Sequence, residues 1–268
     1  MSGEFAFPWP AWADRVGLSE RPAPDAAGLA VLHAAQFFAI PFENLDIQLG
    51  RGIDLAPAAL VAKLVDRRRG GYCFELNGLM LLALRHLGYD ARPLLARVHL
   101  ESPPSGRTHQ LNAVALGDAT WLMDVGFGAG GPRRPLLLAD GWETVGEHWG
   151  FRLERREPWG WLMSSLTPDG WRPSYSFDLG HVTPADIAVA NFFTSHSPDT
   201  HFTRTRVVSR PTADGRVSLR NQVRTRVVGA DTVVDEIPPG APTMAVLADE
   251  FGLVVDAAFG DFRPVADD

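Results

Sequence analysis

The sequence has almost no cysteine or lysine and no long apolar run. Cys73 is the only cysteine among 268 residues, which excludes an intrachain disulfide and a cysteine-rich zinc cluster and fits a reducing compartment. No apolar run approaches the roughly 18 residues of a membrane span, and residues 1–10 lack the basic and apolar regions of a signal peptide. We therefore expect a cytoplasmic protein with no membrane partner. From the single lysine, Lys63, we infer nothing about function.

Basic residues are also in the minority. The 25 lysine and arginine residues face 32 aspartate and glutamate residues, which gives a net charge of −7 and a pI near 5.6. This balance excludes the broad positive field that nucleic-acid binding needs, so an anionic ligand must be met by a local site. With 46% hydrophobic residues, the chain can bury a sizeable core in one large domain or a few small ones.

The apolar pattern changes twice along the chain. It predicts a helical part over residues 1–90, a β-rich part over residues 91–182 and a mixed part over residues 183–268, which together form an α+β class. Helices are predicted over residues 25–39, 57–65, 74–87, 183–193 and 243–252. Short strands of a small antiparallel barrel or sandwich are predicted between turns at residues 103–106, 117–118, 158–160 and 168–170. Two later strands are predicted around residues 203–208 and 216–228.

Cys73 lies at the start of the third predicted helix. There the unpaired N–H groups and the positive end of the helix dipole favour a thiolate. Gly70 and Gly71 let another group approach closely, and residues 67–69 are three arginines that add positive charge nearby. The same pattern also fits a small buried apolar residue. A reactive cysteine needs a base, so the choice depends on a second group.

His109 is the candidate base, in a strand that returns through Gly117 and Asp118. If that loop has two residues, Asp124 is the diagonal neighbour of His109 on the same face of the hairpin. A loop of three residues would put the two on opposite faces. Taken singly, His109 fits a half-buried strand histidine and Asp124 fits a turn acid. Together with Cys73 they form the arrangement of an activated nucleophile.

Four blocks follow one another in a fixed order: IPFENL at residues 40–45, RGGYCFELN at 69–77, DVGFG at 124–128 and NFFTSHSPDTHF at 191–202. They resemble the signature blocks of the arylamine N-acetyltransferase family. The resemblance implies a helical bundle, a central antiparallel β-barrel and a C-terminal α/β lid, with a core like that of cysteine proteases. It also implies acetyl transfer from acetyl-CoA to arylamines, arylhydrazines or arylhydroxylamines by a ping-pong mechanism through an acetyl-cysteine. The implied catalytic triad is Cys73, His109 and Asp124.

The resemblance further implies which residues meet the ligands. The substrate pocket would include Phe127 and Phe202, with Phe37 or Phe38 as further candidates. Coenzyme A would contact Thr108, Gly126, Phe127 and Gly128. The glycine-rich run at residues 126–131, followed by Arg133 and Arg134, fits either an anion site or a flexible barrel loop. His196 and His201 lack a clear third ligand, so no metal is predicted.

Other functions fit the same residues. An amide synthase of ansamycin-type polyketide biosynthesis would use the same triad on a tethered acyl chain. A cysteine peptidase or transglutaminase has the same chain order of cysteine, histidine and acid. A protein that binds aromatic amines or coenzyme A without catalysis would keep the aromatic cleft. The sequence leaves these alternatives and the oligomeric state open.

Overall fold

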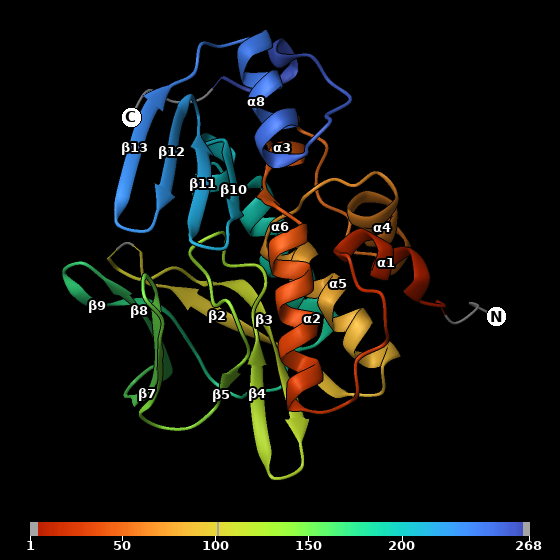
Figure 1. Cartoon of the computed structure of the whole chain (residues 1–268), viewed down its shortest axis with the longest axis vertical. Coiled ribbons are helices and arrows are strands. Elements are labelled where there is room, and N and C mark those ends of the chain that lie inside the picture. Colours follow the sequence, from red (N-terminus) through yellow and green to blue (C-terminus); the bar gives the residue numbers. More distant parts are fainter. Residues whose placement is uncertain (1–4, 101, 265–268) are drawn as a thin grey trace.

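The computed structural model describes residues 5–100 and 102–264. Each of the three predicted parts includes one or more positions outside the described residues, namely 1–4, 101 and 265–268. Helices, an eight-stranded sheet and a five-stranded sheet make up the fold, which confirms the predicted α+β class (Figure 1). The division of the chain at residues 90 and 182 stays a prediction. Within the described ranges, no helix is long and apolar enough to cross a membrane.

The elements have the following bounds. The helices are α1 (Trp9–Val16), α2 (Ala26–Ala39), α3 (Leu45–Gln48), α4 (Pro57–Val61), the π-helical turn η1 (Ala62–Asp66), α5 (Cys73–His86), α6 (Pro184–His196), α7 (His201–Arg204), α8 (Ala241–Phe251) and the short 3-10 helix η2 (Phe259–Asp261). The strands are β1 (Phe42–Glu43), β2 (Asp90–Val98), β3 (Arg107–Leu116), β4 (Ala119–Met123), β5 (Leu136–Leu137), β6 (Trp142–Val145), β7 (Gly150–Arg156), β8 (Gly160–Thr167), β9 (Gly170–Phe177), β10 (Val207–Pro211), β11 (Gly215–Arg220), β12 (Val223–Val228) and β13 (Asp231–Glu236).

Helix α5 forms the centre of the helical part. Its first turn is held by a capping interaction, because the Glu75 carboxylate accepts a hydrogen bond from the Tyr72 N–H at 3.1 Å. The helix ends at His86, before Gly88 takes the left-handed conformation that suits glycine. Most of its side chains lie in one large core cluster shared with α1 and α2. The predicted helix over residues 74–87 is therefore confirmed, one residue earlier than expected at each end.

Two other predicted helices in this part differ in their regularity. The Asp25 side chain caps α2 by accepting the Gly28 N–H at 2.8 Å, as its position in the sequence predicts. The helix predicted over residues 57–65 is α-helical only as far as Val61 and continues as the π-helical turn η1. This wider turn brings Lys63 beneath the first turn of α5, where its ammonium group meets Glu75.

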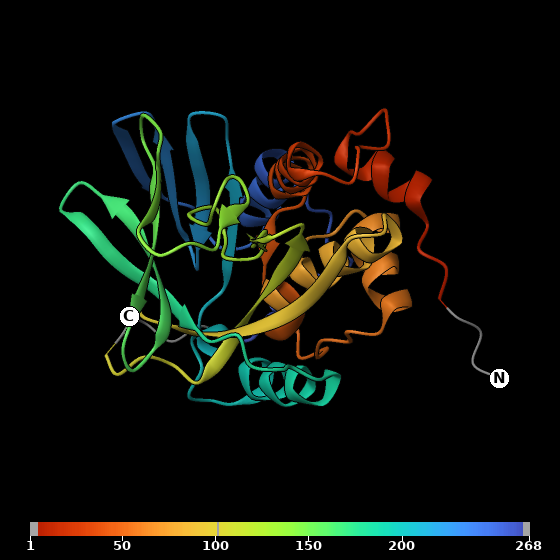
Figure 2. The same ribbon diagram turned by 90° about the horizontal axis from the view of Figure 1, so that it is seen from below.

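The eight-stranded sheet carries the barrel predicted for the middle of the chain. Its strand order is β5-β4-β3-β2-β9-β8-β7-β6, and all its pairings are antiparallel. The sheet curls strongly on itself (Figure 2) and encloses its own core cluster. Leu116 pairs with Ala119, so the β3–β4 loop contains only Gly117 and Asp118. The two-residue loop that the pairing of His109 with Asp124 requires is thus present.

The five-stranded sheet differs most from the sequence prediction. Its order is β1-β10-β11-β12-β13, so the short strand β1 joins it to the N-terminal part (Figure 1). The predicted strand over residues 216–228 was wrong, because it is a hairpin of β11 and β12. Its turn contains Asn221, which takes the left-handed conformation that asparagine tolerates. Residues 203–204 are helical rather than extended, and β13 had no prediction.

Candidate active site

Cys73 is the first residue of α5 and is only 3% exposed. Two glycines allow the chain to reach this position. A Cβ atom at Gly70 would lie 2.4 Å from the Pro41 carbonyl oxygen, and one at Gly71 would lie 2.9 Å from the Glu75 side chain. The Cys73 Sγ lies 3.7 Å from the Thr108 carbonyl oxygen, at the start of the strand that carries His109. The nucleophile predicted from the sequence therefore faces the predicted base.

His109 and Asp124 form a buried hydrogen-bonded pair. The distance from His109 Nε2 to Asp124 Oδ2 is 2.8 Å, and both side chains are almost fully enclosed. The pairing of β3 with β4 stops at Asn112 and Met123, after which the chain turns and presents Asp124 to the imidazole. With Nε2 bound to the carboxylate, Nδ1 is the ring nitrogen left for Cys73, whose sulfur interacts with the same ring.

The charges of this pair support each other. Burial by itself lowers the pKa of His109, but the charge and hydrogen bond of Asp124 outweigh it and raise that pKa to about 10. Burial by itself raises the pKa of Asp124, yet attraction to His109 and three hydrogen bonds hold that pKa below its ordinary value. Both pKa shifts favour the charged forms, so a protonated His109 lies beside an ionised Asp124 in a buried place with little access for water.

Asn77 holds the acid in place, a role that the sequence analysis missed. It lies one turn after Cys73 on the same helix and is completely buried. Its Nδ2 donates to Asp124 Oδ1 at 3.0 Å and to the Gln110 carbonyl at 2.6 Å, while its Oδ1 accepts the Val125 N–H at 3.0 Å. A buried amide in an otherwise apolar helix was the available signal, since such a group must find polar partners inside the protein.

Aromatic rings surround the imidazole. Phe127 lies edge-on to His109 with ring centroids 5.0 Å apart, and Tyr175 of β9 lies 5.1 Å from both rings. The Tyr175 hydroxyl is buried close to the Asp124 carboxylate and interacts with it, although the two do not have the geometry of a regular hydrogen bond. Burial, followed by the nearby charge of Asp124, raises the pKa of this phenol well above its ordinary value. Tyr175 was also missed, because it reaches the site from a strand distant in the sequence.

The phenylalanines predicted to contact the substrate lie in different surroundings. Phe202 packs edge-on against Tyr72, the residue before Cys73, with centroids 5.8 Å apart. Phe37 is buried in the helical core and packs edge-on against Phe38, which lies under the Arg133 guanidinium. Phe37 and Phe38 thus contact the core and the loop after Asp124 rather than the triad rings.

The glycine-rich loop after Asp124 packs closely against the nucleophile. A Cβ atom at Gly126 would lie 2.9 Å from the Cys73 Cα atom, so only glycine fits there. Gly128 accepts the Gly131 N–H at 3.0 Å in a tight turn. Arg133 donates to the carbonyl groups of Thr212 and Gly215 at 2.8 Å and 2.6 Å. These hydrogen bonds occupy the Arg133 guanidinium at the turn between β10 and β11. Arg133 therefore does not support the interpretation of the glycine-rich loop as an anion site.

A buried charge cluster lies behind the first turn of α5. The Lys63 Nζ atom lies 2.7 Å from both Asp46 Oδ2 and Glu75 Oε1, and the Arg69 Nη2 atom lies 2.7 Å from Glu43 Oε1. Burial alone lowers the pKa of Arg69, but the charges of Glu43 and Asp46 raise it overall. The sequence analysis expected the three arginines before Cys73 to add positive charge near its sulfur. Arg69 does not do so, because its charge is paired with Glu43 and Asp46.

Lowering the pH is expected to destabilise the protein through His33. This buried imidazole lies 2.8 Å from the Pro132 carbonyl, and burial lowers its pKa from 6.5 to about 4. As the pH falls from 6.5 to 4, His33 of the unfolded chain takes up a proton more readily than His33 of the folded protein. The free energy of unfolding therefore decreases over this range, and the loss is complete once the pH has fallen through 4. The loss amounts to at most about 3 kcal/mol.

Urea unfolding across this pH range measures the effect. The free energy of unfolding of the wild type should fall more steeply with decreasing pH than that of His33→Gln, which carries no titrating group at this position. Parallel curves for the two proteins would contradict the role given to His33.

Comparisons with known proteins agree with this geometry. A family model described as N-acetyltransferase matches residues 25–259. The chain is 39% identical over 237 residues to an arylamine N-acetyltransferase / N-hydroxyarylamine O-acetyltransferase of Salmonella typhimurium, covering 87% of this chain and 84% of the relative. It is 36% identical to the arylamine N-acetyltransferase of Escherichia coli, covering 91% and 88% of the two chains.

Solved structures show the same fold. The arylamine N-acetyltransferase from Salmonella typhimurium superimposes with a TM-score of 0.88 at 35% identity, covering 96% of each chain. That of Mycobacterium marinum in complex with CoA superimposes with a TM-score of 0.85 at 32% identity, covering 91% and 92%. Across the described residues, no group of three or more His, Cys, Asp or Glu side chains could hold a metal ion. The chain belongs to the arylamine N-acetyltransferase family.

Proposed function

We propose that this protein transfers an acetyl group from acetyl-CoA to the nitrogen of arylamines, arylhydrazines or arylhydroxylamines. The observation that carries the proposal is the buried chain of Cys73, His109 and Asp124, in which a sulfur, an imidazole and a carboxylate follow one another. This arrangement activates a nucleophile, holds the proton that the leaving group needs and stabilises the charge on the ring. The compartment that fits a single free thiol is the cytoplasm.

In the first half-reaction, the Cys73 thiolate attacks the thioester carbonyl of acetyl-CoA. A new carbon–sulfur bond forms at Cys73, the bond to the CoA sulfur breaks, and the departing CoA thiolate takes the proton from His109. Since one thioester replaces another, the acetyl-enzyme lies close in free energy to its donor. The Cys73 N–H at the start of α5 is placed to stabilise the oxyanion that forms on the way.

In the second half-reaction, the amine nitrogen attacks the acetyl-cysteine. His109, now neutral, accepts the proton that the nitrogen loses and returns to the imidazolium form as the thiolate leaves. Asp124 keeps the Nε2–H of the ring directed toward itself, so that Nδ1 faces the sulfur and the incoming amine. Asn77 in turn keeps the carboxylate oriented.

Apolar walls around the sulfur favour the amine over water. Cys73 is 3% exposed, and Phe127 and Phe202 pack against its two neighbours in the site, His109 and Tyr72. Rings of this kind stack with an aromatic acceptor and keep water from the acetyl group. Aromatic amines are therefore the acceptors that the site suits, with Phe37 and Phe38 as more distant candidates for the pocket.

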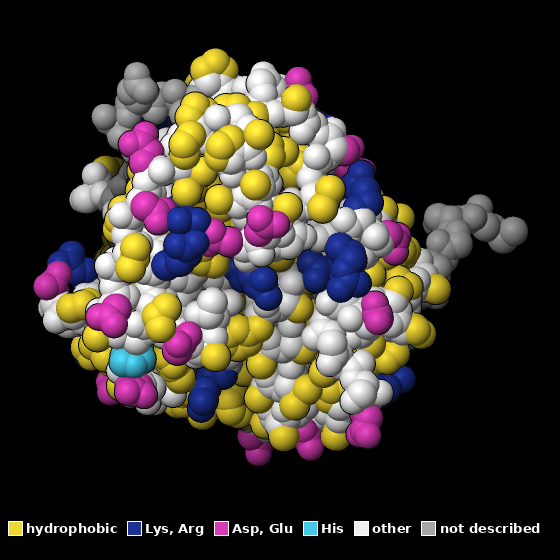
Figure 3. Space-filling model, turned by 45° about the horizontal axis from the view of Figure 1, so that its top comes forward, with side chains coloured by type: hydrophobic (Ala, Val, Ile, Leu, Met, Phe, Trp, Pro, Cys, Tyr) yellow, Lys and Arg dark blue, Asp and Glu magenta, His cyan; other side chains and the backbone are white. Residues whose placement is uncertain are grey.

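The proposed contacts of coenzyme A begin beside the sulfur. Thr108 and Gly126 each approach Cys73, and Phe127 and Gly128 continue from Gly126 along the same loop. Farther along, a hollow of about 320 Å³ is lined by Gly130, Gly131 and Arg216, and also by the carboxylates of Glu147 and Asp214. The phosphate-bearing end would meet Arg216 and the two glycines there. Arginine side chains also gather in a row across the face shown in Figure 3, which offers local positive charge in an acidic protein.

The intact mass of the protein mixed with acetyl-CoA alone tests the proposal. We expect the mass to rise by one acetyl group, peptide mapping to place that group on Cys73, and a later addition of an arylamine to remove it. Absence of the adduct, or an adduct on another residue, would overturn the proposed mechanism. Acylation by a carrier-bound acyl chain but not by acetyl-CoA would instead favour an amide synthase.

A further inference from the structure

Helix α6 exposes large apolar side chains and buries several polar ones. Its buried face carries Ala190 together with Asn191, Thr194 and Ser195, whereas Val189, Phe192 and Phe193 point outward and are 72%, 66% and 48% exposed. Figure 2 shows the helix at the rim of the molecule, with its outer side away from both sheets. A surface helix normally buries its apolar face, so this arrangement calls for an explanation.

The buried face fixes the orientation of the helix. Asn191 accepts a hydrogen bond from the Tyr72 hydroxyl and donates to the Ile53 carbonyl at 3.1 Å. The hydroxyl groups of Thr194 and Ser195 donate to carbonyl groups of the helix itself, both at 2.7 Å. Turning the helix inward would break the contacts of Asn191 and leave buried polar groups unpaired. The aromatic rings therefore cannot reach the core of their own chain.

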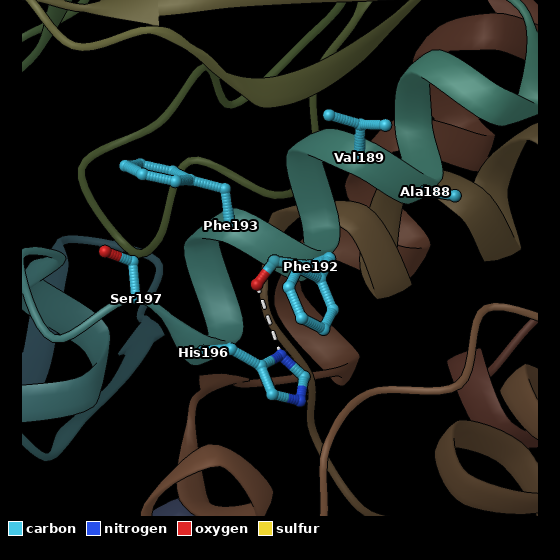
Figure 4. A pocket seen from close by; sticks show the side chains of 6 residues that line it. All are labelled: Ala188, Val189, Phe192, Phe193, His196 and Ser197. Carbon is cyan, nitrogen blue, oxygen red and sulfur yellow. Dashed lines mark hydrogen bonds between the residues drawn. The ribbon is translucent and has the colours of Figure 1, made fainter.

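The outer face forms an apolar hollow. Its volume is about 680 Å³, and its lining consists of Ala188, Val189, Phe192, Phe193, His196 and Ser197 (Figure 4). The rings of Phe192 and Phe193 project from the helix in different directions and leave the space between them open (Figure 4). An uncovered surface of this kind on a folded chain marks an interaction site.

Charge decides between the possible occupants. Between Arg172 and Arg204 the sequence contains no lysine or arginine, and Asp186 and Asp199 belong to this segment. Arg107 of β3 interacts electrostatically with Asp186, but its guanidinium is already paired with Asp178. Binding to an anionic membrane surface or to nucleic acid needs basic residues beside the apolar ones, so neither fits this face. The occupant must be largely apolar and must tolerate an acidic rim.

We propose that two copies of this chain associate through α6, with the helices packed antiparallel about a two-fold axis. The first half of the outer face is built of small residues, Ala185 and Ala188, and the second half carries the two rings. Antiparallel packing lays the ring-bearing half of each helix on the small half of the other and brings Val189 opposite Phe192 of the second copy.

The ends of the two helices are complementary as well. Asp186 in the first turn of one copy comes next to His196 in the last turn of the other, and the helix dipoles oppose each other. A helix of 13 residues is about 20 Å long, which places the contact at the small end of specific interfaces. The dimer is therefore weak and depends on protein concentration. It does not rest on the proposed acetyl transfer.

Sedimentation velocity over a range of concentrations tests the dimer. The wild type should sediment faster as its concentration rises. In Val189→Glu, two carboxylates meet near the axis, and the dissociation constant should rise about tenfold or more. The matched control is Val254→Glu at another exposed valine, 80% exposed after α8, which should dimerise like the wild type. Acetyl-enzyme formation should be unchanged in both variants, which shows that they fold.

Three results would overturn the proposal. The first is a wild type that stays monomeric at all concentrations, and the second is a Val189→Glu variant that dimerises as the wild type does. The third is a monomer that co-sediments with phosphatidylserine vesicles through this face and loses that binding in Val189→Glu. The last result would assign the face to a membrane.

Discussion

Replacing Cys73 by serine is expected to lower the rate of acetyl transfer by a factor on the order of 10⁴ or more. The reason lies in the charge state of the site. The pKa of His109 is raised to about 10, although burial alone would lower it, so the ring already carries its proton at neutral pH. A serine hydroxyl would meet an imidazolium with no lone pair to accept its proton and would stay a weak nucleophile.

The measurement combines intact mass with steady-state rates. Cys73→Ser should gain no acetyl group from acetyl-CoA and should show no turnover above background, while its thermal unfolding stays close to that of the wild type because oxygen and sulfur occupy similar space. Alkylation of the wild type by iodoacetamide serves as a second route to the same loss, since the sequence offers this reagent a single thiol. Appreciable turnover by the serine variant would show that another group carries the acetyl.

Replacing His109 by glutamine is expected to slow acetylation of Cys73 by a factor of about 10³ to 10⁴. Glutamine keeps much of the volume beside Phe127 and Tyr175 but supplies neither the positive charge that pairs with a thiolate nor a base for the second step. Asp124 then loses its charged partner and stays buried, which adds a cost in stability.

Single-turnover rates with acetyl-CoA measure this effect. The matched control is His99→Gln, at a histidine whose Nε2 lies 2.8 Å from the Ser176 hydroxyl outside the triad, and its rate should equal that of the wild type. The pH dependence adds a second readout, because the wild type keeps its imidazolium until the pH approaches 10, whereas the variant has no such group. Equal rates for wild type and His109→Gln would remove this histidine from the mechanism.

The proximity of Cys73, His109 and Asp124 was predictable because each step follows from local rules. The helix start at Cys73 follows from the glycines before it and the apolar run after it. The two-residue turn places Asp124 on the His109 side of the hairpin, just after the last residue of β4. Local patterns of this kind suffice where the residues lie in one helix or one hairpin.

Contacts between distant segments were not predictable in the same way. Tyr175 reaches His109 because its strand β9 pairs with β2, which is the neighbour of β3. No local sequence pattern predicts the pairing of β9 with β2. The hairpin of β11 and β12 was hidden because its turn uses Asn221 in place of glycine or proline. The pairing of Arg69 with Glu43 and Asp46 likewise depends on how β1 and α3 fold against α5.

The enclosed position of Lys63 has a practical consequence for chemical labelling. Acetyl-CoA reacts slowly with exposed lysines of most proteins without any enzyme, and such background obscures mass measurements. Here the only lysine of the sequence is 6% exposed and held between Asp46 and Glu75. The chain therefore offers no accessible lysine amine, so spontaneous lysine acetylation should leave almost no trace in such measurements.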